Sequence, residues 1–384
     1  MYKITYKITY KMITRTLTKI VDDKLFKGKA IILIGPRQVG KTTLIKALLK
    51  HKDYLFLNGD EPIIRSNLTN PSIQKLKSIL GNAKIVFIDE AQRIENIGIT
   101  LKIIHDQFKD IQLLVSGSSA FELKNEMNEP LTGRKWEYNL YPISYEEYEK
   151  QFGYIAAQSD LETRLIYGFY PDIINNRGSE VELLNQLTES YLYKDILSYA
   201  NIKKPDVLEK ILQALAFQVG NEVSFNEIAQ LVGVDKNTVG TYVRLLELGY
   251  VVYALPSFSR NLRNEIKTNK KYYFYDNGIR NALIQNFNPI EFRNDIGALW
   301  ENFLIGERLK RNHYHLKYAN SFFWRTIQQQ EVDYVEEKGG KINGFEFKWN
   351  PKAKVKLPKN FIAAYDASFT VINKDNFRDF ICFD

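Results

Sequence analysis

Residues 31–44, which read IILIGPRQVGKTTL, constrain the fold of this chain more than any other stretch. Four apolar residues indicate a buried strand, and the glycine-bearing run after them indicates a turn that opens a helix. Gly35, Gly40, Lys41 and Thr42 match the pattern G-x4-G-K-[ST] without a mismatch. Such glycines let backbone N–H groups point at phosphate oxygens, while the lysine adds charge and the threonine hydroxyl suits Mg²⁺. The stretch therefore predicts a loop that binds a nucleoside triphosphate.

The whole loop is expected to contact the nucleotide. The residues predicted to bind ATP are Gly35, Pro36, Arg37, Gln38, Val39, Gly40, Lys41, Thr42 and Thr43. The helix that begins near Gly40 would direct the positive end of its dipole at the phosphates. Among these side chains Lys41 is expected to act catalytically, by neutralising charge on the transferred phosphoryl group.

Two acids follow a later apolar run and predict the rest of the ATP site. Asp89 ends the run KIVFID (84–89), where it and Thr42 would hold Mg²⁺. Glu90 is placed to polarise the attacking water. Two acids can also simply end a strand, but the phosphate loop upstream favours the catalytic interpretation. Ser116 or Ser118, after the next apolar run, would sense the γ-phosphate or place the water, although Ser-Gly-Ser-Ser is also a common turn.

Arg134 is the candidate for a contribution from a second subunit. It ends the tetrapeptide Leu131-Thr132-Gly133-Arg134, and an arginine can stabilise transition-state charge in a neighbouring active site. This interpretation predicts a homo-oligomer. Alternatively, Arg134 is a surface residue that pairs with Glu126 or Glu129.

Alternation of apolar runs with helical stretches predicts an α/β fold with a parallel sheet in the N-terminal part. The expected strands beyond the first are 54–58, 84–90, 111–119 and 135–143, with a helix over 98–108. At 384 residues, two to four domains are expected. The net charge of +8 permits a nucleic-acid partner without establishing one. A single cysteine and no apolar run near 18–20 residues predict a soluble, cytoplasmic protein without a membrane partner.

Five motifs in order resemble one protein family. They are GPRQVGKTTL (35–44), FIDEAQ (87–92), SGSSAFEL (116–123), LTGR (131–134) and YPISYEEY (141–148). The chain from about Met12 onwards resembles prokaryotic ATPases of the AAA+ superfamily that carry a C-terminal domain of unknown function. The resemblance implies an AAA-type core, a winged helix-turn-helix and a small α/β domain like that of restriction endonucleases.

The expected organisation has five segments. Residues 1–11 repeat Tyr-Lys-Ile-Thr and end before Met12, so they are expected to be a disordered or non-native extension. The other segments are an ATP-binding domain (12–150), a helical lid or linker (151–204), the winged helix-turn-helix (205–290) and the nuclease-like domain (291–384).

A helix pair over 224–233 and 235–249, followed by strands over 250–258 and 270–276, fits the winged helix-turn-helix. On the second helix Val239, Val243 and Leu246 form the expected buried face. The residues left outward, with side chains suited to duplex DNA, are Lys236, Asn237, Thr241 and Arg244. Winged helices are also protein-docking modules, so both interpretations stay open.

The C-terminal segment carries a second candidate metal site. Glu301 lies on a predicted helix (298–311) and Asp333 on a predicted hairpin and strand (324–337). Glu346 and Lys348 lie on one face of a predicted strand (343–350). This set resembles the PD-(D/E)xK nucleases, in which carboxylates hold Mg²⁺ beside the scissile phosphate. Alternatively, the set is one charged face of a half-buried sheet, or an inherited site that no longer cuts.

ATP hydrolysis with Mg²⁺ is the central functional prediction. The first hypothesis is a DNA-associated ATPase whose nucleotide state controls the C-terminal domains. The second is an ATP-dependent switch that docks protein partners without DNA, and the third is an ATP-regulated, Mg²⁺-dependent nuclease.

Overall fold

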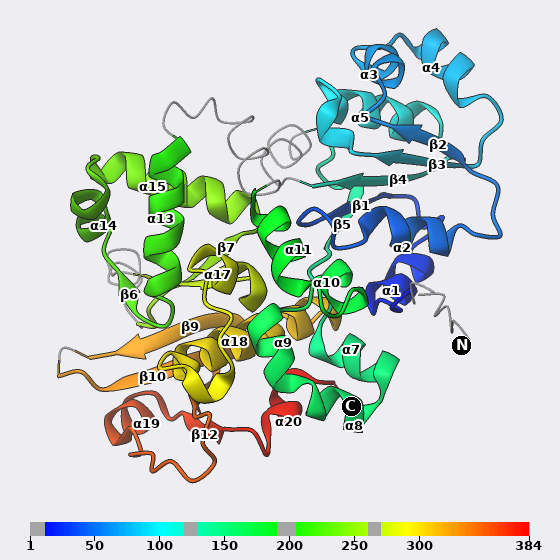
Figure 1. The fold of residues 1–384 in the computed structure, drawn as a ribbon. Helices are drawn as coiled ribbons and strands as arrows, with labels where there is room; N and C mark the ends of the chain where they lie inside the picture. The colour runs from blue at the N-terminus through cyan, green and yellow to red at the C-terminus, as the bar shows by residue number, and fades with distance from the viewer. Residues whose placement is uncertain (1–11, 119–129, 190–204, 260–269, 327, 384) are drawn as a thin grey trace, which may run out of the picture.

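The computed structural model describes residues 12–118, 130–189, 205–259, 270–326 and 328–383 (Figure 1). The repeat over residues 1–11 and the acids Glu126 and Glu129 lie outside these ranges. A five-stranded sheet of order β2-β3-β4-β1-β5, with every pair parallel, forms the N-terminal part. Its strands are β1 (Ala30–Ile34), β2 (Leu55–Asn58), β3 (Ile85–Asp89), β4 (Gln112–Gly117) and β5 (Lys135–Asn139). The predicted parallel α/β fold is thus confirmed.

Helices cover both faces of this sheet: α3, α4 and α5 lie above it and α1 and α2 below it in the view of Figure 1. Their bounds are α1 (Leu17–Asp23), α2 (Lys41–Leu48), α3 (Pro62–Leu68), α4 (Ile73–Leu80), the 3-10 turn η1 (Ala91–Arg93) and α5 (Ile97–Gln107). Strand β5 is shorter than the predicted 135–143. It stops before Pro142, which has no N–H to donate to a sheet.

Short helices follow the sheet in residues 145–187, within the part of the chain that the structure describes. They are α7 (Tyr145–Phe152), α8 (Tyr154–Ser159), α9 (Leu161–Tyr167), α10 (Pro171–Asn175) and α11 (Glu180–Leu187). Ser144 and Glu147 form a capping box that starts α7, each side chain bonding the other residue's backbone N–H. The prediction of a helical segment is confirmed for the part of it that the structure describes.

The next segment combines helices with a small antiparallel sheet of order β6-β8-β7. Its elements are α13 (Pro205–Phe217), β6 (Glu222–Val223), α14 (Phe225–Val232), α15 (Lys236–Leu248), β7 (Val252–Leu255), β8 (Lys270–Phe274), α17 (Asn277–Leu283) and the 3-10 turn η3 (Ile290–Phe292). The predicted helix pair and its two following strands are present. Strand β6 was not predicted, because two residues are too short to show a period.

A four-stranded sheet of order β12-β11-β10-β9 and the long helix α18 form the C-terminal part. Its elements are α18 (Ile296–Tyr314), β9 (Asn320–Arg325), β10 (Glu331–Lys338), β11 (Lys341–Phe347), α19 (Lys359–Tyr365), β12 (Ser368–Ile372) and α20 (Phe377–Ile381). Strands β9, β10 and β11 pair antiparallel, and β12 joins β11 in parallel. The predicted strand over 343–350 ends at Phe347, so Lys348 follows the strand instead of lying in it.

One hydrophobic core runs through all of these parts. It contains residues as far apart as Leu33 of β1, Leu246 of α15, Leu304 of α18 and Phe380 of α20. Burial of apolar surface is the main force that holds such elements together. Because the segments share one core, we expect them to stabilise one another instead of folding independently. None of the described helices is both long enough and apolar enough to cross a bilayer.

Candidate functional site

The phosphate loop joins the end of β1 to the start of α2, and its shape depends on two glycines. A Cβ atom on Gly35 would lie 2.0 Å from the carbonyl oxygen of Leu140, so the loop can pass β5 only without a side chain there. Gly40 has φ +92°, in the left-handed region that favours glycine, and directly precedes α2. The buried Lys41 ammonium donates to the carbonyl oxygens of Gly35 (2.9 Å) and Pro36 (2.7 Å). The loop thus holds its own lysine above the start of the helix.

The carboxyl ends of three adjacent strands bring the predicted magnesium ligands together. Strand β4 lies between β1 and β3, so Ser116 falls between the loop and Asp89. The Thr42 hydroxyl donates to Asp89 Oδ2 at 2.7 Å, and the Ser116 hydroxyl donates to Asp89 Oδ1. These are hard oxygen donors next to a phosphate-binding backbone, which is the chemistry that Mg²⁺ requires. The residues present therefore fit a Mg²⁺ ion.

Glu90 lies beside Asp89 and is held by two side chains. Gln92 donates from Nε2 to Glu90 Oε2 (2.5 Å) and to Ser118 Oγ (2.7 Å), and Ser118 Oγ lies 3.4 Å from the same carboxylate oxygen. Gln92 is buried on the 3-10 turn η1. The sequence prediction missed Gln92, although its place two residues after Glu90 was a signal. Together these contacts orient one carboxylate at the end of β3.

An apolar cavity of about 540 Å³ adjoins the loop. It is lined by residues that include Ile13, Val39, Thr43, Leu44, Ile143 and Pro171. A pocket of this size and polarity can take a planar aromatic ligand. An apolar cavity thus lies next to the loop, so the two sites together suit the base and the phosphates of a nucleotide.

Comparison with known proteins agrees with this geometry. Residues 27–149 match the family model described as an AAA domain. This chain contains a P-loop ATPase domain of the AAA type. Residues 158–289 and 296–379 match two further models, described as domains of unknown function (DUF8612 and DUF4143). The expected family resemblance is thus confirmed for the ATPase domain and for the presence of a C-terminal domain of unknown function.

Relatives of the full chain occur in bacteria and archaea. An uncharacterized protein of Haemophilus influenzae is 25% identical over 341 residues, covering 81% of this chain and 80% of the relative. One of Methanocaldococcus jannaschii is 24% identical over 345 residues, covering 83% and 74%. The Walker-type ATPase PABY2304 of Pyrococcus abyssi superimposes with a TM-score of 0.50 at 15% identity, over 71% of this chain and 96% of that chain. At this identity the likeness concerns the fold alone.

A buried arginine ties the phosphate loop of the ATPase domain to the rest of the chain. Arg15 donates from Nη1 to the Val39 carbonyl (2.7 Å) and from Nη2 to Tyr141 O (2.6 Å) and to the hydroxyl of Tyr314 on α18 (3.1 Å). Its Nε pairs with the buried Glu147 at 3.1 Å. Burial alone lowers the pKa of the Arg15 guanidinium, but Glu147 and Tyr314 more than compensate and raise it. Arg15 therefore remains a cation and connects the ATPase domain, α7 and α18.

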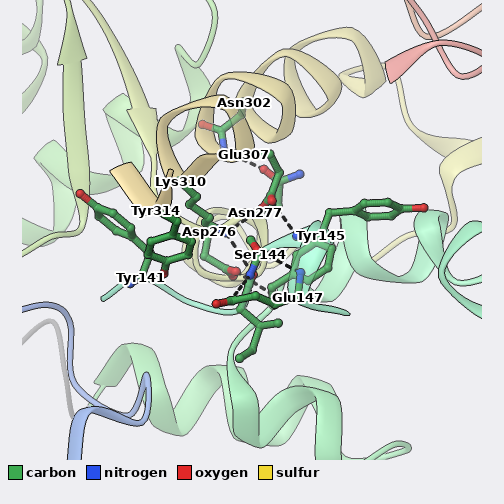
Figure 2. A network of polar contacts seen from close by, with 12 residues as sticks. Tyr141, Ser144, Tyr145, Glu147, Asp276, Asn277, Asn302, Glu307, Lys310 and Tyr314 are labelled. Carbon is green, nitrogen blue, oxygen red and sulfur yellow. Dashed lines mark hydrogen bonds and ion pairs between the residues drawn. The ribbon is translucent and has the colours of Figure 1, made fainter. Parts of the chain in front are cut away.

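A second group of contacts runs beside this arginine (Figure 2). Glu307 of α18 accepts from the backbone N–H of Tyr145 (2.6 Å) and from Lys310 Nζ (2.7 Å). Lys310 also donates to the Ile143 carbonyl at 3.2 Å. The sequence prediction missed Arg15 and Tyr314, for which no local motif exists. Glu147 could have been found from its capping-box spacing with Ser144.

Arg134 lies at the amino ends of the strands of the parallel sheet, whereas the phosphate loop lies at their carboxyl ends. It precedes β5, whose first residue pairs with Ala30 at the start of β1. Its Nε donates to Asp106 Oδ1 at 2.9 Å, and its side chain is 35% exposed. This contact, with His105, lowers the pKa of Asp106 to about 2. Arg134 therefore does not reach the ATP site of its own chain.

The four residues proposed to contact DNA are all exposed on α15, whereas Val239, Val243 and Leu246 are buried. The outward and inward faces of this helix thus agree with the sequence pattern. Arg244 makes one exposed contact, 3.5 Å to Glu247.

The four residues of the predicted second metal site lie close together, and two of its three acids, Glu301 and Glu346, pair with lysines. Lys348 Nζ lies 2.7 Å from Glu346 Oε1, and Asp333 Oδ2 accepts from the backbone N–H of Phe347 at 2.7 Å. Burial, and then the charge of Glu301, raise the pKa of Asp333 to about 7. In the part of the chain that the structure describes, no three Asp, Glu, His or Cys side chains are placed to hold a metal ion. The residues as arranged do not fit a divalent cation, and the nuclease function stays a prediction.

Proposed function

We propose that this chain hydrolyses Mg·ATP in its AAA-type domain and transmits the nucleotide state to its C-terminal domains, acting in association with DNA. The observation that carries the proposal is the position of Arg15. One buried guanidinium bonds a carbonyl of the phosphate loop, Val39, and a hydroxyl of α18, Tyr314. A shift of the loop on binding phosphate therefore acts directly on the C-terminal domain.

The chemistry proposed for the ATP site follows from its geometry. Thr42 and Asp89 would hold Mg²⁺, which would neutralise charge on the phosphates. Lys41 exchanges its two loop carbonyls for phosphate oxygens. Glu90 accepts a proton from the attacking water, with its carboxylate held in one orientation by Gln92. Ser116, which bonds Asp89, is proposed to sense the γ-phosphate or to place the attacking water.

The nucleobase is proposed to enter the apolar cavity beside Val39 and Thr43. This cavity also borders Arg15 and Ile143, whose carbonyl accepts from Lys310 of α18. Both ends of the nucleotide, phosphate and base, thus lie next to groups bonded to α18. Nucleotide binding would therefore increase the population of the α18 conformation that is compatible with the nucleotide-bound loop.

The coupling is tested by hydrogen–deuterium exchange of α18 in the full chain, with and without a non-hydrolysable ATP analogue. Nucleotide binding should change the exchange of α18 peptides in the wild type. In Tyr314→Phe the change should become smaller while the analogue still binds, because the bond from Arg15 to α18 is lost and the contact of Lys310 with the Ile143 carbonyl remains. Tyr318→Phe, at a tyrosine that is 80% exposed, is the matched control. Unaltered α18 exchange in a wild type saturated with analogue refutes the coupling.

Association with DNA is proposed through helices α14 and α15 and the sheet β6-β8-β7, which we interpret as a winged helix-turn-helix. What supports it is the exposure of Lys236, Asn237, Thr241 and Arg244 on one face of α15. The test is the salt dependence of duplex binding. Replacing Lys236 or Arg244 by alanine should lower the slope of log K against log salt by roughly one for each phosphate that is no longer neutralised. Intact ATP turnover with no binding at low salt would instead favour a protein-docking module.

Arg134 is proposed to act in the ATP site of a neighbouring copy. It lies at the amino ends of the strands, away from its own phosphate loop, and its side chain is 35% exposed although it pairs with Asp106. A cytoplasmic location is proposed as well, because the single cysteine, Cys382, is buried and unpaired.

A further inference from the structure

A buried lysine from one domain lies inside the acidic cluster of another. Lys271 belongs to β8, and its side chain is only 1% exposed. Its ammonium lies 2.5 Å from Glu331 Oε1 of β10 and 3.3 Å from Glu301 Oε1 of α18. Glu301 Oε1 also accepts from the hydroxyl of Tyr273, at 2.5 Å. Strand β8 thus supplies two side-chain donors to Glu301, Lys271 and Tyr273, among the residues that the structure describes.

The position of Lys271 is fixed by its backbone. Strand β8 is the central strand of its sheet, and Lys271 pairs with Glu222 of β6 on one side and with Leu255 of β7 on the other. The sheet is joined to the C-terminal sheet by backbone bonds from Phe258 N to Phe323 O (2.6 Å) and from Phe323 N to Pro256 O (3.0 Å). The backbone of Lys271 is therefore held next to the C-terminal sheet, and its buried side chain reaches the acids from there.

The charges of the cluster require a cation at this point. Glu301, Glu331, Asp333 and Glu346 are carboxylates that influence one another across it, since Asp333 is shifted by Glu301 and Glu346 by Asp333. Burial alone lowers the pKa of Lys271, but the facing carboxylates, Glu301 foremost, raise it above its ordinary value. A buried charge is stable only when it is paired and hydrogen-bonded. Lys271 meets that need from outside the C-terminal domain.

We propose that Lys271 is the resident cation of this cluster. It takes the place that a divalent metal would otherwise occupy, so the cluster fastens the three-stranded sheet to the C-terminal domain and does not bind metal. The four acids and Lys348 are then an ion-pair junction, and metal-dependent cleavage is not an activity of the chain. This inference is independent of ATP hydrolysis and of DNA binding.

The test is Mn²⁺ binding to the full chain without nucleotide, counted by electron paramagnetic resonance and followed by thermal unfolding. Lys271→Met removes the ammonium and keeps a side chain of similar length. We expect this variant to bind one more Mn²⁺ per chain than the wild type. We also expect Mn²⁺ to stabilise it, because the ion replaces the positive charge that the acids have lost. Adding Asp333→Asn should abolish both effects. Lys270→Met, at the exposed neighbour on the same strand, should behave as the wild type.

Two results would overturn the proposal. The first is a folded Lys271→Met chain that binds no more Mn²⁺ than the wild type. The second result comes from a comparison without a Lys271 variant, so it can be obtained even if Lys271→Met does not fold. Wild type and Glu346→Gln should bind Mn²⁺ equally, and loss of a bound ion in Glu346→Gln would show that the native cluster holds metal.

Discussion

Removing the hydroxyl of Tyr314 is the sharpest test of how the ATPase domain is joined to the C-terminal domain. This side chain is 2% exposed, and its hydroxyl accepts from the backbone N–H of Tyr141 (3.0 Å) and from Arg15 Nη2 (3.1 Å). Tyr314→Phe keeps the ring and its packing. It leaves one buried backbone N–H without that acceptor and takes one bond from a buried guanidinium.

The expected loss of stability follows from those two bonds. An unsatisfied buried donor costs about 1–3 kcal/mol. The guanidinium retains Val39 O, Tyr141 O and Glu147, so its share is smaller, about 1 kcal/mol. The sum predicts that the free energy of unfolding falls by about 3 kcal/mol. The exposed control, Tyr318→Phe, should change it by less than about 0.5 kcal/mol.

Urea unfolding followed by tryptophan fluorescence measures this change. Trp136 lies in β5 of the ATPase domain, whereas Trp300 lies in α18 and Trp324 in β9, so the signal reports both sides of the junction. In the wild type the two sides should unfold in one transition, because they share a core. If Tyr314→Phe unfolds within about 0.5 kcal/mol of the control (a difference typical of surface substitutions), the hydroxyl does not join the domains.

Three further outcomes are expected. Lys41→Ala should weaken nucleotide binding by roughly tenfold or more, and Lys46→Ala, at an exposed lysine of the same helix, should not, as a titration with a fluorescent ATP analogue would report. Glu90→Gln should bind ATP normally but lose about 10²–10⁴-fold in turnover in a phosphate-release assay, and normal turnover would place the water-activating role elsewhere. The pKa of Asp333 is raised to about 7, so the folded chain keeps a proton on this carboxyl that the unfolded chain loses near pH 4. The Tm of the wild type should therefore fall as pH rises between about 4 and 7, and the Tm of Asp333→Asn should fall less.

A further expectation concerns assembly. Turnover per subunit should rise with protein concentration in the wild type, and Arg134→Ala should abolish that rise. Concentration-independent turnover in the wild type would make Arg134 a residue that only pairs with Asp106.

The local geometry of the phosphate loop and of the strand end at Asp89 was largely predictable, because it depends on neighbouring residues. Gly35 and Gly40 are needed for backbone reasons that a short motif records, and Asp89 ends a strand that its apolar run identifies. Strand ends were less predictable. Strand β5 ends at Asn139, and the N–H of Tyr141 donates to the Tyr314 hydroxyl instead of to the sheet. Strand β6 has only two residues, which carry no period.

The sequence by itself determined the parallel α/β ATPase domain, its phosphate loop and the two faces of α15, because each depends on residues within one period or one turn of each other. Only the tertiary structure decided that Arg15 joins the loop to Tyr314, 299 residues later in the chain, and that Lys271 enters the acids of another domain. Such contacts leave no local pattern, since a buried charge is stabilised by whichever partner the fold brings within hydrogen-bonding distance. The motif at Gly35 predicts where a nucleotide binds, and the fold determines which distant residues contact that loop.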